Sequence, residues 1–243
     1  MNEFELIVPD WPAPGNVRAC ATTREGGVSE QEFCSLNLAS HVGDRDENVA
    51  ENRKRLRVFA GLPAEPRWLN QAHGNRIADL SRSVPVSADA AVGNGPGQVC
   101  TILTADCLPI LLCSVDGAQV GAVHAGWRGL AGGVIEATVK MMSHGGQRLL
   151  AWLGPAIGPA AYQVGAEVRQ AFVENSQANG TFFADDGPGH WRADLYGLAR
   201  RLLEARGVAV FGGGFCTHSD SRRFFSYRRD GQCGRQASLI WLE

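Results

Sequence analysis

Three short apolar segments, close together in the chain, constrain its fold more than any other feature. Residues 99–103 and Leu108–Ser114 are apolar and have the length of buried strands, and residues 119–124 form a third such segment. The Asp-Gly pair at 116–117 separates the last two segments. An Asp-Gly turn between apolar runs predicts a β-hairpin, so we expect a buried sheet to form here.

The rest of the chain alternates between helical and strand-like patterns. Strands outnumber helices and the helices fall between groups of strands, which predicts an α/β fold of mixed β-sheets with helices packed outside. No repeat, low-complexity tract or Ser/Pro-rich linker interrupts the 243 residues, so we expect 1–243 to form a single domain. Helices are expected at 46–60, 129–143 (ending at glycines 145–146), 166–174 and 193–206, and further strands at 17–23, 68–71, 75–80, 149–153, 208–211, 224–227 and 237–242.

Composition narrows the possible partners and the compartment. Charged residues make up 20% of the chain and its formal net charge is −2, which does not favour a nucleic-acid partner. The acidic start is not typical of a signal peptide, and no apolar run approaches the ~20 residues that span a bilayer. Seven cysteines without a CxxC pair disfavour a disulfide framework. We therefore expect a cytoplasmic protein without a membrane partner; the oligomeric state is left open.

One cysteine and two histidines form a candidate metal-binding set. Cys107 precedes one predicted strand, His124 ends the hairpin that follows, and His73 lies in a turn beside Gly74. Thiolate and imidazole suit zinc and also copper, and three protein ligands leave one coordination position open for chemistry. The alternative is a small buried cysteine and two hydrogen-bonded structural histidines.

Other polar residues near this set are candidates for supporting roles. Asp106 can orient a metal ligand or cap a turn. A helix starting near residue 129 would favour an anion such as phosphate. Arg24 and Arg228 lie beside glycine-containing turns and can hold an anionic substrate group. Asn37, in an otherwise apolar segment, is either a structural hydrogen-bond hub or a substrate contact.

Short motifs spread along the chain resemble one known family. They are CATTREGGVS at 20–29, SLNL at 35–38, NR at 52–53, QAHG at 71–74, TADCLP at 104–109, VHAGWRG at 123–129, GPAIGP at 154–159 and FFSYRRD at 224–230. Together they resemble the bacterial YfiH-like family, also called the laccase-domain or polyphenol-oxidase family, over residues 6–242. Its members are described as purine nucleoside phosphorylases and as peptidoglycan editing factors.

The resemblance implies a fold, a cofactor and an activity. It implies a layered α/β fold similar to cysteine-hydrolase-like proteins, and a catalytic zinc on His73, Cys107 and His124. The implied activities are phosphorolysis of adenosine, inosine, guanosine and methylthioadenosine, plus deamination of adenosine, with a nucleoside and phosphate as small-molecule partners. Several relatives carry a second cysteine two residues after the position of Cys216, where this chain has His218.

Several alternatives stay open at this point. Cys107 as nucleophile with His124 as base would make a cysteine hydrolase or amidase that edits peptidoglycan precursors. A third possibility is a non-catalytic partner of cell-wall enzymes with a structural metal. Copper in place of zinc could give polyphenol oxidation, although six histidines without a His-x-His pair do not fit a four-copper enzyme. The H-x-E…P-C-x-x-C pattern of nucleobase deaminases is absent, and the sequence does not identify the group that stabilises a leaving purine.

Overall fold

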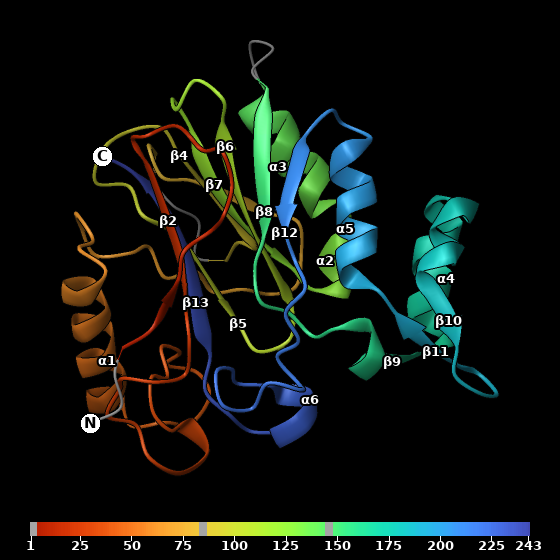
Figure 1. The fold of residues 1–243 in the computed structure, drawn as a ribbon, viewed down its shortest axis with the longest axis horizontal. Helices are drawn as coiled ribbons and strands as arrows, with labels where there is room; N and C mark the ends of the chain where they lie inside the picture. Colours follow the sequence, from red (N-terminus) through yellow and green to blue (C-terminus); the bar gives the residue numbers. More distant parts are fainter. Residues whose placement is uncertain (1–3, 83–86, 144–147) are drawn as a thin grey trace.

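The computed structural model describes residues 4–82, 87–143 and 148–243. Its largest sheet has six strands in the order β12-β8-β6-β7-β4-β3 (Figure 1). The hairpin predicted between the apolar segments is present as β6 and β7, and it lies at the centre of this sheet. The pairs β3–β4 and β8–β12 are parallel and the other pairs are antiparallel, so the sheet is mixed, as predicted. The strands are β3 (Ile77–Asp79), β4 (Ala90–Gly93), β6 (Leu108–Ser114), β7 (Val120–Ala125), β8 (Leu149–Leu153) and β12 (Ala209–Gly212).

A second, antiparallel sheet packs against one face of the first. Its order is β1-β2-β13-β5, with β1 (Leu6–Ile7), β2 (Val17–Thr22), β13 (Gln236–Leu242) and β5 (Cys100–Thr104). Side chains of both sheets, including Leu111, Trp152, Ile102 and Ile240, form one buried cluster between them. The alternate residues of β6, such as Ile110, enter the core on the opposite face. Because both faces of β6 are covered, the segment is apolar throughout instead of alternating.

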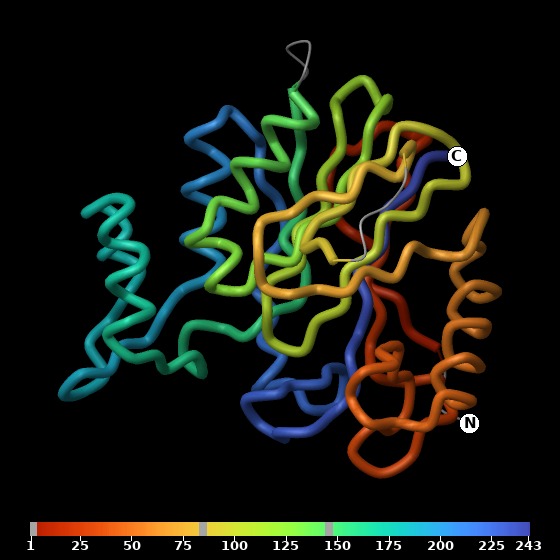
Figure 2. Tube along the Cα trace, turned by 180° about the vertical axis from the view of Figure 1, so that it is seen from behind, coloured from red at the N-terminus to blue at the C-terminus, as the bar shows by residue number. Residues whose placement is uncertain are grey.

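Helices cover the outer faces of the two sheets. Helices α3 (Val134–Met142) and α5 (Leu195–Glu204) pack on the six-stranded sheet, and α1 (Asp46–Phe59) packs on the four-stranded sheet, which Figure 2 shows from behind. The layers therefore run helix, sheet, sheet, helix. The remaining helices are α2 (Trp127–Ala131), α4 (Ala166–Asn175), α6 (Tyr227–Asp230) and the 3₁₀ turns Gln31–Phe33, Pro159–Ala161 and Gln177–Phe182.

A small three-stranded sheet and α4 lie at one side of the molecule (Figure 1). Its antiparallel strands, in the order β10-β11-β9, are three or four residues long and were not predicted from the sequence. The strands are β9 (Gln163–Gly165), β10 (Phe183–Asp185) and β11 (His190–Ala193). Across the described ranges, no helix is both long enough and apolar enough to cross a membrane.

Three predicted elements differ from the structure. The helix expected at 129–143 is divided into α2 and α3, because Gly133 adopts a left-handed φ of 84° that ends one helix before the next begins. The glycines at 145–146, expected to end it, lie outside the described residues. The strand prediction for 68–71 is wrong: only isolated bridges form near it, at Arg67 and Asn70.

The strand prediction for 224–227 is also wrong, for a different reason. Phe224 and Phe225 are fully buried, which explains the strand-like pattern, but α6 begins at Tyr227. The side chain of Gln236 accepts a hydrogen bond from the Phe225 amide at 3.0 Å and donates one to its carbonyl at 3.3 Å. A side-chain amide thus satisfies the backbone groups that a neighbouring strand would otherwise bind.

Candidate metal centre

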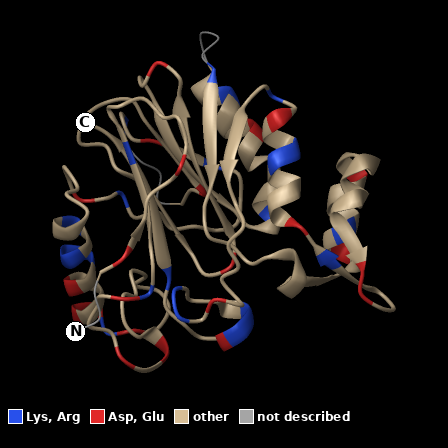
Figure 3. Ribbon diagram, in the orientation of Figure 1, with Lys and Arg blue, Asp and Glu red and all other residues tan. Residues whose placement is uncertain are grey.

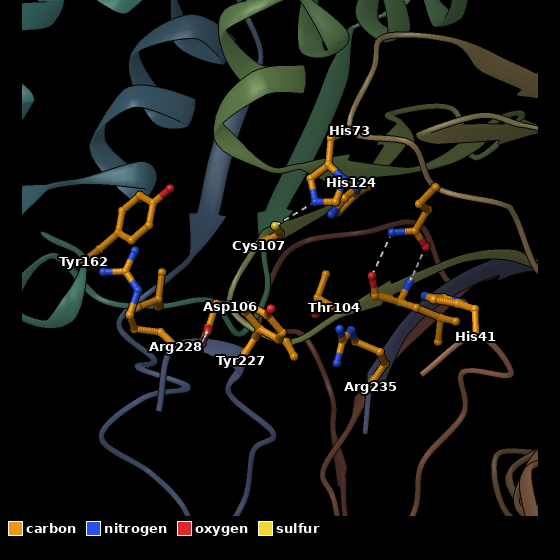
Figure 4. A pocket seen from close by; sticks show the side chains of 14 residues that line it. His41, His73, Thr104, Asp106, Cys107, His124, Tyr162, Tyr227, Arg228 and Arg235 are labelled. Carbon is orange, nitrogen blue, oxygen red and sulfur yellow. Dashed lines mark hydrogen bonds between the residues drawn. The ribbon is translucent and has the colours of Figure 1, made fainter. Parts of the chain in front are cut away.

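His73, Cys107 and His124 converge at one end of the central strands β6 and β7 of the six-stranded sheet (Figure 4). Their potential ligand atoms all lie within 4.8 Å of one another. Cys107 Sγ is 3.9 Å from His73 Nε2, and the two imidazole rings meet edge-on with centroids 4.8 Å apart. His124 is buried, Cys107 is half-buried and His73 is exposed, so the group is anchored in the core and open on one side.

The β6–β7 hairpin brings Cys107 and His124 together. Its register pairs Pro109 with His124 and Leu108 with Ala125. Cys107, immediately before β6, therefore lies beside the end of β7, where His124 is one residue from the last position. His73 approaches from a separate loop, and its left-handed φ of 60° turns the chain sharply there. Two of the candidate ligands are thus positioned by local strand pairing and the third by tertiary structure.

Asp89 organises this group, and no sequence motif pointed to this residue. Its carboxylate accepts hydrogen bonds from the backbone amides of His73 at 2.8 Å and Gly74 at 2.7 Å. It also lies 2.8 Å from His124 Nδ1. With Nδ1 bonded to Asp89, His124 presents Nε2 to the site, which is the carboxylate–histidine arrangement common at metal centres. Only the tertiary contact between residues 35 positions apart reveals this role.

Electrostatics favour an ionised thiol in the metal-free protein. Burial opposes ionisation of Cys107, but the neighbouring His124 and His73 outweigh it and lower its pKa to about 6. Burial likewise opposes protonation of His124, while the Cys107 thiolate and the Asp89 carboxylate raise the pKa of His124 to about 9. Thiolate is the form of cysteine that binds metals and acts as a nucleophile.

The space between the three side chains fits a metal ion. Gly126 faces it: a Cβ added at this glycine would lie 3.0 Å from Cys107 Sγ, 3.0 Å from His73 Cδ2 and 3.7 Å from His124 Nε2. Tetrahedral zinc, with bonds of about 2.3 Å to sulfur and about 2.0 Å to nitrogen, separates its ligand atoms by about 3.5 Å. The observed 3.9 Å between Cys107 Sγ and His73 Nε2 is close to that spacing. The glycine therefore keeps clear a space that this donor set can fill with an ion.

The three residues line a pocket of about 440 Å³. In Figure 4, Tyr162 and Arg228 lie on one side of Cys107, and Thr104, His41 and Arg235 lie on the other. The Arg228 guanidinium donates to the Gln163 carbonyl at 2.8 Å and lies over the ring of Tyr162. Arg228 is thus the predicted substrate residue that the structure brings to the pocket.

The other two predicted substrate residues are not among the described residues that line this pocket. Arg24 donates to the carbonyls of Cys34 and Ser221 and lies over the ring of Phe225. Asn37 is fully buried and acts as a hydrogen-bond hub, because its amide binds Ala39, the Asp44 carboxylate and the backbone amide of Arg235. Asn37 thereby holds the backbone of a residue that does line the pocket.

Asp106 and the nearby helix have different roles from those considered above. The Asp106 carboxylate accepts hydrogen bonds from the Thr217 hydroxyl at 2.6 Å and from the Arg228 amide at 2.7 Å. It ties Thr217 to the first turn of α6, which carries Arg228, whereas Asp89 orients His124. The helix beside the site begins at Trp127 and has only five residues, so we assign no anion site to its N-terminus.

Comparison with known proteins identifies the family. Residues 18–243 match the family model described as multi-copper polyphenol oxidoreductase laccase. The chain is 54% identical over 239 residues to a protein of Pseudomonas aeruginosa named purine nucleoside phosphorylase, covering 98% of both chains. It is 49% identical to the purine nucleoside phosphorylase YfiH of Escherichia coli K12, covering 98% of this chain and 99% of that one. The chain therefore belongs to the laccase-like YfiH family, which confirms the resemblance of its motifs.

Solved structures agree with this membership. A Neisseria meningitidis protein superposes with a TM-score of 0.93 at 45% identity, covering 98% of this chain and 99% of that chain. YlmD from Geobacillus stearothermophilus superposes with a TM-score of 0.88 at 29% identity, covering 96% and 94%. Within the described ranges of this chain, only one group of three or more His, Cys, Asp or Glu side chains is placed to hold a metal, and it consists of His73, Cys107 and His124.

Proposed function

We propose that this protein is a zinc-dependent purine nucleoside phosphorylase, with zinc on His73, Cys107 and His124. The observation that carries the proposal is a three-ligand group that opens into a pocket also lined by Arg228. The names of the relatives support the reaction class. The expected substrates are adenosine, inosine, guanosine and methylthioadenosine together with phosphate, and adenosine deamination is proposed as a side activity.

Zinc is preferred to copper because of the donor set. One thiolate and two imidazoles with an open position are typical of catalytic zinc. Copper binds nitrogen and sulfur donors more tightly in general, so a copper-loaded form remains the alternative, with polyphenol oxidation as its activity. Measuring both metals in protein purified without added metal decides between them.

The chain's own residues would supply binding and orientation. Asp89 holds the His124 imidazole through Nδ1 and fixes the backbone of His73. Arg228 offers its guanidinium to an oxygen of the phosphate. When bound, the ion would supply Lewis acidity toward an oxygen of phosphate or water. Arg24 and Asn37 remain predicted substrate residues. Their contacts support an indirect effect on substrate binding, because Arg24 binds the Cys34 carbonyl and Asn37 binds the backbone amide of Arg235, which lines the pocket.

The test is product analysis with and without phosphate. With adenosine and phosphate, chromatography should reveal adenine and ribose 1-phosphate, and without phosphate only inosine. Cys107→Ser should lose both the metal and the phosphorolysis, whereas Cys34→Ser, an exposed cysteine outside the pocket, should keep them. Full metal retention in Cys107→Ser would contradict the proposed ligand set.

A cysteine hydrolase is the second candidate, and one observation favours it. Cys107, His124 and Asp89 are arranged like a nucleophile, a base and an orienting carboxylate. Such an enzyme could act as an amidase that edits peptidoglycan precursors, in keeping with the fold similarity to cysteine-hydrolase-like proteins that we expect. A chelator should abolish activity if the metal mechanism holds. Activity that survives chelation but not thiol alkylation would favour the hydrolase.

We also propose one domain, a reducing compartment and small-molecule partners. The pocket takes His41 from the N-terminal part and Arg235 from the C-terminal part, which supports a single domain over 1–243. All seven cysteines are free, which supports the cytoplasm. In Figure 3 both signs of charge are interspersed over the described elements, which favours neither nucleic acid nor a membrane surface as partner.

A further inference from the structure

Thr104 presents a feature that the metal centre does not explain. It lies at the end of β5, is 2% exposed and lines the pocket, yet its hydroxyl has no hydrogen-bond partner in the described structure. An unpaired buried hydroxyl is unfavourable, and such groups at a pocket wall are commonly satisfied by a ligand. The hydroxyl therefore indicates a polar ligand atom on the side of the pocket away from Arg228.

Arg235 and His41 lie on that side of the pocket, and Tyr227 lies between them and Arg228 (Figure 4). Within the described structure, the side-chain hydrogen bonds of Arg235 use Nη1 of its guanidinium, which donates to the Cys233 and Gly234 carbonyls and to the Cys233 sulfur. No described residue accepts a hydrogen bond from its Nε or Nη2, so both groups can donate to a ligand. The ring of Tyr227 is 60% exposed and lies 5.8 Å from the Arg235 Cζ. We call Thr104, Arg235, Tyr227 and His41 the second arm of the pocket.

The chemistry of the second arm matches a planar, electron-rich heterocycle better than a phosphate. An exposed tyrosine ring offers a flat surface for stacking. A hydroxyl and a guanidinium can donate to the acceptors of a purine, which are the ring nitrogens N3 and N7 and, in hypoxanthine and guanine, the exocyclic oxygen. In a nucleoside phosphorylase the ribose C1′ lies between the base and the phosphate, so the two must occupy opposite ends of the site. Arg228 lies at the other end.

We propose that the second arm is the purine-base subsite and that Arg235 stabilises the charge on the departing base. This rests on the proposed phosphorylase activity. The C1′–N9 bond breaks with its electron pair going to the purine, while an oxygen of HPO₄²⁻ forms the new bond to C1′. The hydrogen of HPO₄²⁻ ends on a ring nitrogen of the purine, so atoms and charge balance. The fixed guanidinium charge offsets the negative charge that develops before that protonation.

Binding measurements test the subsite apart from catalysis. Calorimetry with hypoxanthine and, separately, with inorganic phosphate would be run on the metal-loaded protein and on Thr104→Val. Hypoxanthine affinity should fall about tenfold, the effect of losing one hydrogen bond, while phosphate affinity stays unchanged. Thr101→Val is the matched control, because Thr101 is on the same strand and its hydroxyl is also buried and unpaired, but it does not line the pocket. Neither variant should lose thermal stability.

Kinetics test the charge-stabilising role of Arg235. Arg235→Gln should lower kcat with inosine at least a hundredfold and leave the KM for phosphate unchanged. The loss should be much smaller with 7-methylguanosine, whose base leaves without a net negative charge. Arg235→Lys should recover part of the inosine activity, and Arg222→Gln, an exposed arginine outside the pocket, controls for loss of surface charge.

The outcomes separate the two proposals. If hypoxanthine does not bind the wild-type protein, or binds Thr104→Val and Thr101→Val equally well, the base subsite is overturned. A rise in phosphate KM in Arg235→Gln would assign the second arm to phosphate instead. Equal losses with inosine and 7-methylguanosine would overturn the charge-stabilising role. Base binding that weakens in Thr104→Val without any phosphorolysis by the wild-type protein would support the subsite and contradict the proposed activity.

Discussion

At the residue scale, two residues that bind no metal themselves determine the candidate centre. Asp89 connects the His73 loop to His124 through one carboxylate. Gly126 leaves open the space that the three ligand side chains face. If the three candidate ligands bind an ion as proposed, their donor atoms define which ions fit, and Asp89 and Gly126 define whether those atoms are correctly placed around it.

Replacing Asp89 by Asn should weaken zinc affinity about 10–100-fold. The amide removes the negative charge beside His124, and its NH₂ group conflicts with the amide donors of His73 and Gly74. Competition with a chromogenic chelator measures the affinity. Asp10→Asn, an exposed carboxylate, should behave like the wild type. Unchanged affinity in Asp89→Asn would leave Asp89 a purely structural residue.

Replacing Gly126 by Ala should also displace the metal, by a steric route. The new methyl group would lie 3.0 Å from both Cys107 Sγ and His73 Cδ2, while the backbone φ of −66° suits alanine. Metal content per chain should fall well below that of the wild type, with circular dichroism unchanged. Gly15→Ala, where nothing lies within 4 Å, is the control. Normal metal content in Gly126→Ala would show that the ion occupies a different space.

At the element scale, α1 holds in place the segment between β2 and α1, whose one regular element is the 3₁₀ turn Gln31–Phe33. Asn52, fully buried on α1, accepts a hydrogen bond from the Val28 amide at 2.8 Å. It also donates to the Ser29 hydroxyl and to the carbonyls of Ser35 and Asn37. Since Asn37 in turn binds the amide of Arg235, this connection extends from α1 to the pocket wall.

Asn52→Ala should lower the free energy of unfolding by about 3 kcal/mol, because several buried backbone groups lose their partner at once. Urea denaturation followed by circular dichroism measures this. Asn48→Ala, one turn earlier on the same helix and less buried, should change stability by no more than about 0.5 kcal/mol. Equal effects of the two substitutions would mean that the lost stability arises from helix propensity and not from the hydrogen bonds of Asn52.

At the scale of the whole molecule, the fold divides seven free thiols into different environments. Burial raises the pKa of Cys20 and Cys113 to about 12, and raises that of Cys100 further. Burial also opposes ionisation of Cys216, but the Ser219 hydroxyl and the Gly158 amide point at its sulfur and lower its pKa. Cys216, outside the metal centre, is therefore easier to ionise than an ordinary cysteine.

The pH dependence of alkylation should follow this division. A lowered pKa means that thiolate is present at lower pH, so the iodoacetamide reaction at Cys216 should reach half its maximum rate below about pH 8.5, the value for a free cysteine. Cys20 and Cys100 should stay unmodified over the same range. The native protein is alkylated at each pH, and peptide mass spectrometry then measures the extent of alkylation at each cysteine. A Cys216 profile centred above that of free cysteine would contradict the hydrogen-bond effect, and Ser219→Ala should move the profile to higher pH.

Local patterns determined the central elements of the fold. The apolar runs and the Asp-Gly turn predicted β6 and β7, and the apolar segments at 99–103 and 149–153 predicted β5 and β8 within one residue. Such strands are covered on both faces, so their hydrophobicity alone identifies them. The same pattern misled at Phe224 and Phe225, where burial occurs without backbone pairing.

The sequence determined the donor set of the site, because Cys107 and His124 are joined by one hairpin that local turn chemistry specifies. Only the tertiary structure decided how His73 reaches them, that Asp89 holds His73 and His124, and that Arg228 and Arg235 lie at opposite ends of one pocket. These relations join residues from different layers of the molecule. They depend on how two sheets pack, and no local periodicity or turn signal encodes that packing.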